Sequence, residues 1–329
     1  RINLKSIKFR HMKILFATIL SLAVILIASS CSMNTINESD GNKIDFSGSN
    51  NWMSCIADDT LIREMSIPGT HDTCAQYDFL GLSGTAAAQD LSLSELLQAG
   101  VRHVDIRLYW DGTECKIHHG ITYQHMNFDD VLTICYNFLD ENPTETIIFM
   151  IYKEWKCEDS DICQPILDRI NANPTRWITT TSAENLTVGE CRNKLILVKR
   201  FKGLDGIGIP SGSAIGQLHQ VDNYKTNDLD SYWEELKSHL DTMMNATNPA
   251  FTTVWSSGYF EGQFGIPNIR LNSSVTNVKL ENYLDGSYDE QDKKYTKVHF
   301  GIIGCDHITK RLAYKIYRIN LSEDDDKAR

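Results

Sequence analysis

The sequence lacks an excess of positive charge, and this absence limits what the protein can bind. Its 329 residues include 32 Lys and Arg against 43 Asp and Glu, a formal net charge of −11. Because duplex nucleic acids are held by basic surfaces, this balance argues against a nucleic-acid partner. Internal repeats and Cys-x-x-Cys spacings are also absent. The missing cysteine spacing removes the usual signature of a structural zinc site.

Long hydrophobic runs are missing except near the N-terminus. Residues 12–31 read MKILFATILSLAVILIASSC, a single Lys followed by an apolar stretch, small residues and Cys31. The run is short for a bilayer span, although a transmembrane anchor is the alternative, and it is typical of a bacterial lipoprotein signal. We predict a signal peptide over residues 1–31 with Cys31 as the lipid-anchored residue. Residues 1–11, which precede Met12, are expected to be untranslated.

An export signal of this kind predicts a protein that is lipid-anchored in the bacterial cell envelope or, alternatively, secreted. Residues 32–51 are polar and rich in Gly, Ser and Asn, which suits a tether. Loss of residues 1–30, with their five Lys and Arg and no acids, leaves a net charge of −16. Bulk charge therefore cannot attract this protein to anionic lipid.

Eight cysteines follow Cys31, an even number in a chain predicted to be exported. Cys157 and Cys163 bracket a short acidic loop and are the expected disulfide pair. Free buried thiols are the alternative.

The remaining chain alternates between apolar, β-branched runs and amphipathic stretches. This rhythm predicts an α/β fold, a TIM-type parallel (β/α)8 barrel that is distorted or incompletely closed. We expect one catalytic domain over residues 52–322, followed by an acidic tail over 323–329. The predicted strands lie at 61–67, 101–108, 115–119, 146–152, 194–200, 214–221, 251–257 and 299–305. The clearest predicted helices lie at 128–143, 164–174, 231–246 and 309–320.

Ionisable side chains gather at the ends of seven of these predicted strands. Active sites of parallel barrels form at the C-terminal ends of the strands, so the pattern predicts one shared site. Any single residue could instead be a solvated or hydrogen-bonded structural group. The residues in question are His71, Asp72, Asp105, Arg107, His118, His119, Lys153, Glu154, Arg200, Asp222, Tyr224, Asp306 and His307.

Six stretches in this order resemble the bacterial phosphatidylinositol-specific phospholipase C family. The likeness covers about residues 52–320 and implies cleavage of phosphatidylinositol, or of a glycosylated inositol lipid, to diacylglycerol and inositol 1,2-cyclic phosphate. It implies a membrane surface containing that lipid as the partner, and we expect a monomer. The stretches are SIPGTHDT, GVRHVDIRLYWDG, IHHG, NPTETIIFMIYKE, KLILVKRF and QVDNYK.

The reaction requires a general base and a general acid on opposite sides of phosphorus, and histidine suits both tasks near neutral pH. The resemblance implies that His71 is the base and that His119 is the acid. It also implies that Asp306 supports His71 and that Asp72 pairs with His119. Calcium-dependent relatives hold a metal at this place, whereas Arg107, held by Asp105, would supply the positive charge here. We therefore expect no metal and no cofactor.

The resemblance also places the inositol-binding residues. Arg200, Asp222 and Tyr224 match the family in position. The family has a Lys on the fourth strand where this chain has Tyr152, with Lys153 one residue later. Side chains alternate across a strand, so Lys153 reaches the head group only if the strand ends there.

Three other functions are alternatives. A divergent glycerophosphodiester phosphodiesterase would need a metal-binding acidic cluster and a His-Arg-Gly motif that the sequence does not contain. A catalytically inactive inositol-lipid- or glycan-binding surface lipoprotein would not need an acid–base pair, and a purely structural lipoprotein would leave the strand-end pattern unexplained.

Overall fold

A computed structural model describes residues 46–212, 214–261, 266–286 and 299–321. The predicted signal peptide with Cys31, the tether up to residue 45 and the acidic tail lie outside the described residues. Asp45–Arg329 is a single compact unit by its internal contacts. No helix among the described residues is long and apolar enough to cross a bilayer.

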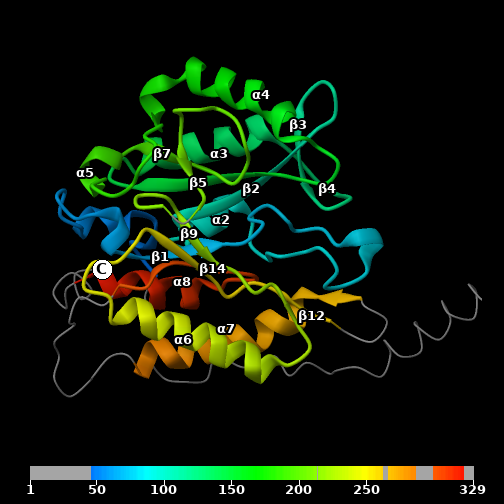
Figure 1. Cartoon of the computed structure of the whole chain (residues 1–329), viewed down its shortest axis with the longest axis vertical. Coiled ribbons are helices and arrows are strands. Elements are labelled where there is room, and N and C mark those ends of the chain that lie inside the picture. The colour runs from blue at the N-terminus through cyan, green and yellow to red at the C-terminus, as the bar shows by residue number, and fades with distance from the viewer. Residues whose placement is uncertain (1–45, 213, 262–265, 287–298, 322–329) are drawn as a thin grey trace, which may run out of the picture. The chain divides into compact units, whose positions relative to one another are not determined.

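Parallel strands form a curled sheet, which confirms the predicted α/β barrel class (Figure 1). Their order is β6-β7-β5-β2-β1-β14-β11-β9, and the first and last long strands of the chain are neighbours. β8 pairs with β7, and among the described residues a one-residue bridge between Ser211 and Leu218 links this side to β9. The bounds are β1 Ser66–Thr70, β2 His103–Trp110, β5 Thr146–Lys153, β6 Trp177–Ile178, β7 Lys194–Lys199, β8 Ile209–Pro210, β9 His219–Val221, β11 Thr252–Trp255 and β14 Gly301–Cys305.

The strands are apolar on both faces because both faces are covered. In β5, Ile147 and Phe149 belong to one buried cluster with residues of the outer helices, whereas Ile148 and Met150 belong to the cluster around Ile67 and other inward-facing residues. Successive side chains of a strand point to opposite faces, so a strand buried on both sides reads as a continuous apolar run. This is why residues 146–151 show no alternation in the sequence.

All four predicted helices form at the expected places. α3 (Phe128–Glu141) and α4 (Asp159–Ala172) cover the outer face of the sheet at β2, β5 and β7, and α6 (Leu229–Met244) and α8 (Lys310–Tyr317) cover it at β11 and β14 (Figure 1). Their starts are capped. Asn127 and Asp130 form a capping box at α3, and the hydroxyl of Thr309 accepts from the amide of Leu312 at α8. Such caps satisfy amides that the first turn leaves without partners.

Three α-helices of the described residues were not predicted: the short α2 (Leu93–Gln98) and α5 (Val188–Cys191), and the long α7 (Ile269–Gly286). The inner face of α7 explains the omission of that helix because it buries polar side chains: Asn272, Ser273, Thr276 and Asn277. Hydrophobic periodicity, the main sequence signal of a helix, is therefore weak there.

The third predicted strand is not a barrel strand, and this part of the sequence interpretation was wrong. β3 (Cys115–His119) and β4 (Thr122–Asn127) form an antiparallel hairpin, and β3 pairs antiparallel with the end of β2. A two-residue turn, Gly120 and Ile121, joins them, with Gly120 at φ 53°. A connection this short between strands can only be antiparallel, since parallel strands need a crossover of a dozen or more residues.

Candidate active site

His71 and Asp306 lie together because they follow neighbouring strands. β1 and β14 pair in register from Ser66 to Thr70, so the residues after each strand are adjacent. Nδ1 of His71 is 2.9 Å from Oδ1 of Asp306, whose other oxygen accepts the Gly258 amide at 2.9 Å. Burial is the largest single influence on the pKa of His71 and lowers it, but the charge of Asp306, its hydrogen bond and the charge of Asp105 together raise the pKa overall.

Arg107 stands at the centre of the group and is almost buried. Its guanidinium donates to Nε2 of His71, with Nη2 at 2.7 Å. It also lies 3.1 Å from Asp105, 3.2 Å from Glu154 and 3.5 Å from Asp72. Burial is the largest single influence on the pKa of Asp105 and raises it, but the positive charges around the carboxylate, that of Arg107 first, together with the Asp72 amide lower the pKa to about 2. A permanently charged group thus occupies the place between three carboxylates.

His119 reaches the site from the end of β3, at the hairpin turn. Its Nδ1 is 2.6 Å from the carbonyl oxygen of Ala86 and 3.4 Å from the carboxylate of Asp72. Because a carbonyl only accepts, Nδ1 carries the hydrogen, and Nε2 is the nitrogen that can exchange a proton. The rings of His119 and His71 have centroids 6.3 Å apart and are nearly perpendicular. Two imidazoles placed in this way can act on opposite sides of one bound group.

Asp72 is unusual in its surroundings. It is fully buried, its φ is 43°, and neither carboxylate oxygen has a hydrogen-bond partner in the described part of the chain. Burial raises its pKa to about 6 despite the positive charges of His119 and Arg107. The Asp72 carboxylate therefore interacts with its neighbours through charge and not through hydrogen bonds. Keeping it ionised in this buried place costs free energy.

The predicted head-group residues are brought together only in part. Arg200 and Asp222 form an ion pair at 3.0 Å, and Tyr224 is 60% exposed beside Tyr259. Lys153 points elsewhere, since its ammonium donates to the carbonyl oxygen of Cys157 at 2.9 Å.

Tyr152 takes the position that Lys153 does not reach. The guanidinium groups of Arg107 and Arg200 lie 5.4 and 5.1 Å from the centroid of its ring. Consecutive residues of a strand face opposite sides of the sheet, so Tyr152 faces the site and Lys153, the next residue of β5, faces away from it.

Sequence reasoning did not assign a role to two further residues of this group. One Glu154 oxygen lies against Arg107, and the other accepts the amide of Gly120 at 3.2 Å. Trp255, from β11, places its ring 5.6 Å from that of His71. Glu154 is among the strand-end residues that the sequence singles out, but without a role, whereas nothing local marks Trp255. No group of three His, Cys, Asp or Glu side chains suited to a metal ion is found within the described ranges.

The predicted disulfide was wrong, because Cys157 and Cys163 are both free thiols. The Cys163 thiol donates to the carbonyl oxygen of Asp159 in its own helix, and Cys157 accepts the amide of Trp110. The alternative of free thiols is the correct one for this pair.

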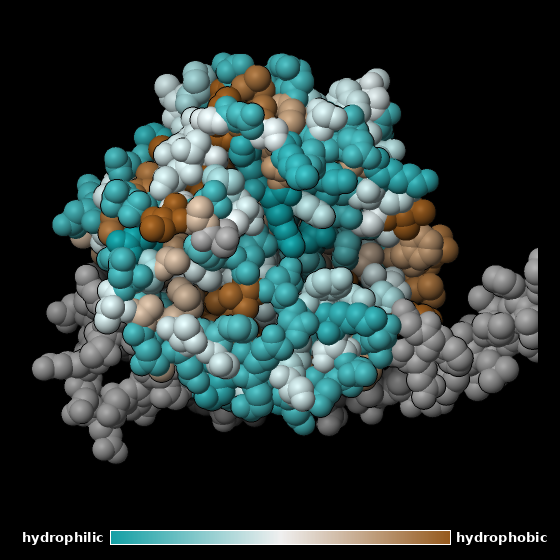
Figure 2. All heavy atoms as spheres, in the orientation of Figure 1, coloured by the Kyte–Doolittle hydropathy of each residue, from teal (hydrophilic) through white to brown (hydrophobic). Residues whose placement is uncertain are grey.

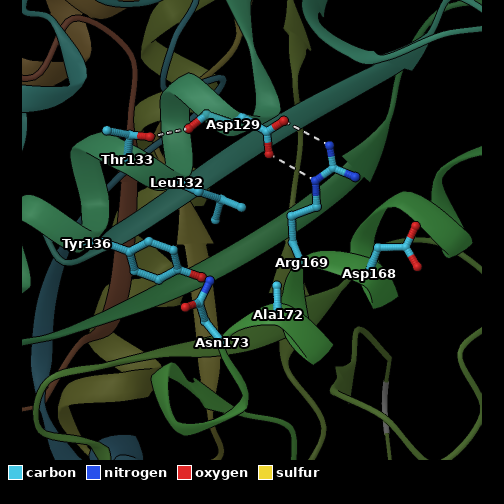
Figure 3. A pocket seen from close by; sticks show the side chains of 8 residues that line it. All are labelled: Asp129, Leu132, Thr133, Tyr136, Asp168, Arg169, Ala172 and Asn173. Carbon is cyan, nitrogen blue, oxygen red and sulfur yellow. Dashed lines mark hydrogen bonds and ion pairs between the residues drawn. The ribbon is translucent and has the colours of Figure 1, made fainter.

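A surface groove of about 420 Å³ lies between α3 and α4, away from these strand ends (Figure 3). Asp129 and Arg169 close a bidentate ion pair across it, at 2.8 and 2.9 Å. Since the only cation lining the groove is already neutralised, the chemistry belongs to the strand ends and not to this groove.

Comparisons with known proteins agree with this geometry. The family model described as phosphatidylinositol-specific phospholipase C, X domain, matches residues 65–201. A 1-phosphatidylinositol phosphodiesterase of Listeria monocytogenes is 29% identical over 232 residues, which are 67% of this chain and 71% of that protein. One from Staphylococcus aureus is 27% identical over 193 residues, 56% of this chain and 57% of that protein.

Solved structures agree in fold. The phosphatidylinositol-specific phospholipase C of Listeria monocytogenes superposes with a TM-score of 0.67 at 24% identity, covering 82% of this chain and 98% of that one. A double mutant of the Staphylococcus aureus enzyme gives a TM-score of 0.70 at 20% identity, covering 84% and 98%.

Proposed function

Residues 65–201 are an X domain of the phosphatidylinositol-specific phospholipase C family, and from this premise we propose that the protein cleaves phosphatidylinositol. The products are diacylglycerol and inositol 1,2-cyclic phosphate. The observation that carries the proposal is the pair of facing imidazoles, His71 and His119, with Arg107 beside them. A site that only bound the lipid would need no such acid–base pair.

In the proposed mechanism, Nε2 of His71 takes the proton of the inositol 2-hydroxyl as that oxygen attacks phosphorus. Arg107 now donates to this nitrogen, and with substrate present its planar donors turn to the phosphate oxygens instead. His119 gives a proton to the departing glycerol oxygen. Asp306 stabilises the His71 imidazolium, and the Asp72 carboxylate, 3.4 Å from Nδ1 of His119, helps to orient that ring.

The proposed reaction uses no metal ion. The guanidinium of Arg107 lies among Asp72, Asp105 and Glu154, and so fills with a fixed positive charge the place where carboxylates could gather around a cation. Preorganised charge of this kind can stabilise a developing phosphorane without the cost of binding an ion.

The head group is expected to lie against Arg200, Asp222 and Tyr224, with Tyr152 rather than Lys153 facing it. We further propose that the chain is exported and held at the envelope through Cys31, and that it acts as a monomer. The proposed export and anchoring rest on the signal-like sequence of residues 12–31, which lies outside the described residues.

Incubation of the protein with phosphatidylinositol in EDTA tests the function directly. We expect diacylglycerol in the organic phase and a cyclic phosphodiester visible by phosphorus NMR. A glycerophosphodiester given in parallel addresses the rival phosphodiesterase. Cleavage of that compound alone, or of neither substrate, would overturn the proposal.

A further inference from the structure

Trp155, directly after β5, is an exposed aromatic residue in a strained conformation. Its side chain is 40% exposed and its φ is 55°. A left-handed backbone is unfavourable in free energy for a bulky residue. Such strain persists only where surrounding groups enforce the conformation. The neighbouring side chain supplies that restraint, since Glu154 accepts the Trp155 amide at 3.2 Å. Folding alone gains little from a strained tryptophan that remains in water.

Trp155 is part of an aromatic ledge, which we define as Tyr109, His118, Tyr123 and Trp155. The indole stacks on the His118 ring with planes 6° apart, and Tyr109 lies 5.2 Å from the indole. His118 also contacts Tyr109 at 4.7 Å and Tyr123 at 5.5 Å. His118 and Tyr123 lie on the same hairpin as His119, and Trp155 directly follows Glu154, which contacts Arg107. The ledge therefore borders the candidate site.

The ledge continues into the exposed segment that follows β1. Tyr77 of that segment packs on His125 at 4.6 Å, and His125 packs on Tyr123 at 5.0 Å. Phe79 and Leu80 follow, 37% and 82% exposed. Figure 2 shows hydrophobic atoms gathered at the right edge, where this cyan segment projects in Figure 1.

Charge indicates which surface the ledge fits. Lys156 is exposed with its ammonium 5.2 Å from the Trp155 ring. Lys116 lies 5.8 Å from the Tyr123 ring but is paired with Asp111 and Glu114. Lys156 is thus the cation left to meet an anionic surface, in a chain whose net charge is −11. The rings of Trp155 and Tyr123 already have lysines of the chain near them. This leaves less room for the quaternary ammonium group of a choline lipid to bind on those rings.

We propose that the aromatic ledge contacts the head-group layer of an anionic lipid bilayer, with Trp155 as its principal anchor. Tryptophan and tyrosine favour the membrane–water boundary, and a lysine near it gains from anionic lipid. Glu154 bridges the Trp155 amide and Arg107, so the anchor has a fixed position relative to the candidate active site. The choice of a lipid surface as partner rests on the proposed function.

The test uses the full chain carrying Cys31→Ser, so that no lipid anchor is attached. Vesicles contain brominated phosphatidylcholine with phosphatidylglycerol, which is not an inositol lipid, so binding is measured apart from cleavage. Trp155 is the most exposed of the six tryptophans, and residues 1–51 contain none. We expect bromine to quench the wild-type tryptophan fluorescence, and we expect Trp155→Asn to lose most of the quenching.

Asn tolerates a left-handed backbone, so this variant keeps the local conformation. The partition coefficient of Trp155→Asn between water and vesicles should be about tenfold lower than that of the wild type. A tenfold change corresponds to losing about half of the free energy gained by burying a large apolar side chain. Val278→Asn, at a 52% exposed position on α7, is the matched control and should bind as the wild type does. Lys156→Gln should weaken binding to phosphatidylglycerol vesicles and not to neutral ones.

Absence of wild-type quenching would overturn the proposal, and so would equal partitioning of Trp155→Asn and the wild type. If the wild type bound neutral vesicles as tightly as phosphatidylglycerol vesicles, the proposed preference for an anionic surface would be overturned. Cleavage of soluble phosphatidylinositol is measured separately. A ledge that does not bind vesicles would therefore leave the proposed function intact, and a protein that does not cleave the lipid could still bind vesicles through the ledge.

Discussion

Nη2 of Arg107 lies 2.7 Å from Nε2 of His71. A guanidinium can only donate, so Nε2 must accept, and the His71 ring is neutral with its hydrogen on Nδ1. That hydrogen points to Asp306 at 2.9 Å. The ring is therefore in the tautomer that a general base requires, with its basic nitrogen toward the group proposed to bind phosphate.

The two proposed proton-transfer residues should be far more sensitive to replacement than their neighbour. We expect His71→Ala and His119→Ala each to lower kcat by about 10²–10⁴-fold, the usual range for an acid or base. His118→Ala should lose much less on a soluble short-chain phosphatidylinositol, because His118 packs among the ledge rings. Steady-state rates decide this. A large loss of kcat in His118→Ala, with full activity in His119→Ala, would mean that His118 and not His119 is the general acid.

Asp72→Asn should make the protein more stable and less active. The folded-state pKa of Asp72 is raised to about 6, so the ionised carboxylate destabilises the folded state at higher pH. Replacement should therefore raise the free energy of unfolding at pH 8 by about 1–3 kcal/mol, and the gain should shrink as the pH falls toward 4.

Urea denaturation of both proteins at several pH values measures this difference. An Asp72→Asn protein that is less stable than the wild type at pH 8 would mean that the ion pairs of Asp72 outweigh its burial.

Arg107→Asp tests the metal-free mechanism. The change removes a donor and adds a carboxylate beside Asp105, so in EDTA it should cost at least about 3 kcal/mol of transition-state stabilisation. Calcium, which prefers oxygen ligands, should restore part of that rate. Recovery should stay incomplete because no outer groups orient the ion.

Initial rates for both proteins in EDTA and in calcium give the answer. The wild type should be equally active in the two media. A wild type that is inactive in EDTA and recovers with calcium would refute the assignment of Arg107.

The segment after β1 should matter for membranes and not for chemistry. Phe79 and Leu80 are exposed, so we expect Phe79→Ser with Leu80→Ser to slow vesicle cleavage by about tenfold or more. Cleavage of a soluble inositol cyclic phosphate should hardly change. Equal losses on both substrates would assign these residues to the core. The loop at residues 259–266 is a second apolar segment expected to contact lipid, and its residues 262–265 lie outside the described residues.

Tyr152 should hold two arginines in place. Its ring lies near the guanidinium groups of both Arg107 and Arg200, and each such contact is worth about 0.5–2 kcal/mol. Tyr152→Phe keeps the ring and should retain activity, whereas Tyr152→Leu should lower kcat/KM about tenfold or more. Activity in Tyr152→Leu equal to the wild type would show that the ring positions neither arginine.

The sequence alone determined the class of fold and the strand-end positions of most residues that are proposed to carry the chemistry. Apolar runs alternating with amphipathic stretches predict a parallel barrel, because periodicity is a local property of the chain. The strand-end positions of His71, Arg107 and Asp306 followed from the same pattern. Glu154 was visible there as well, but its contacts with Arg107 and Gly120 were not.

Only the tertiary structure decided how these residues meet. It placed His119 on an antiparallel hairpin, turned Tyr152 inward and Lys153 outward, and left Cys157 and Cys163 as free thiols. It also formed α7 on a polar inner face. Each of these depends on contacts between segments far apart in the chain, and residue type and spacing within one segment carry no record of them.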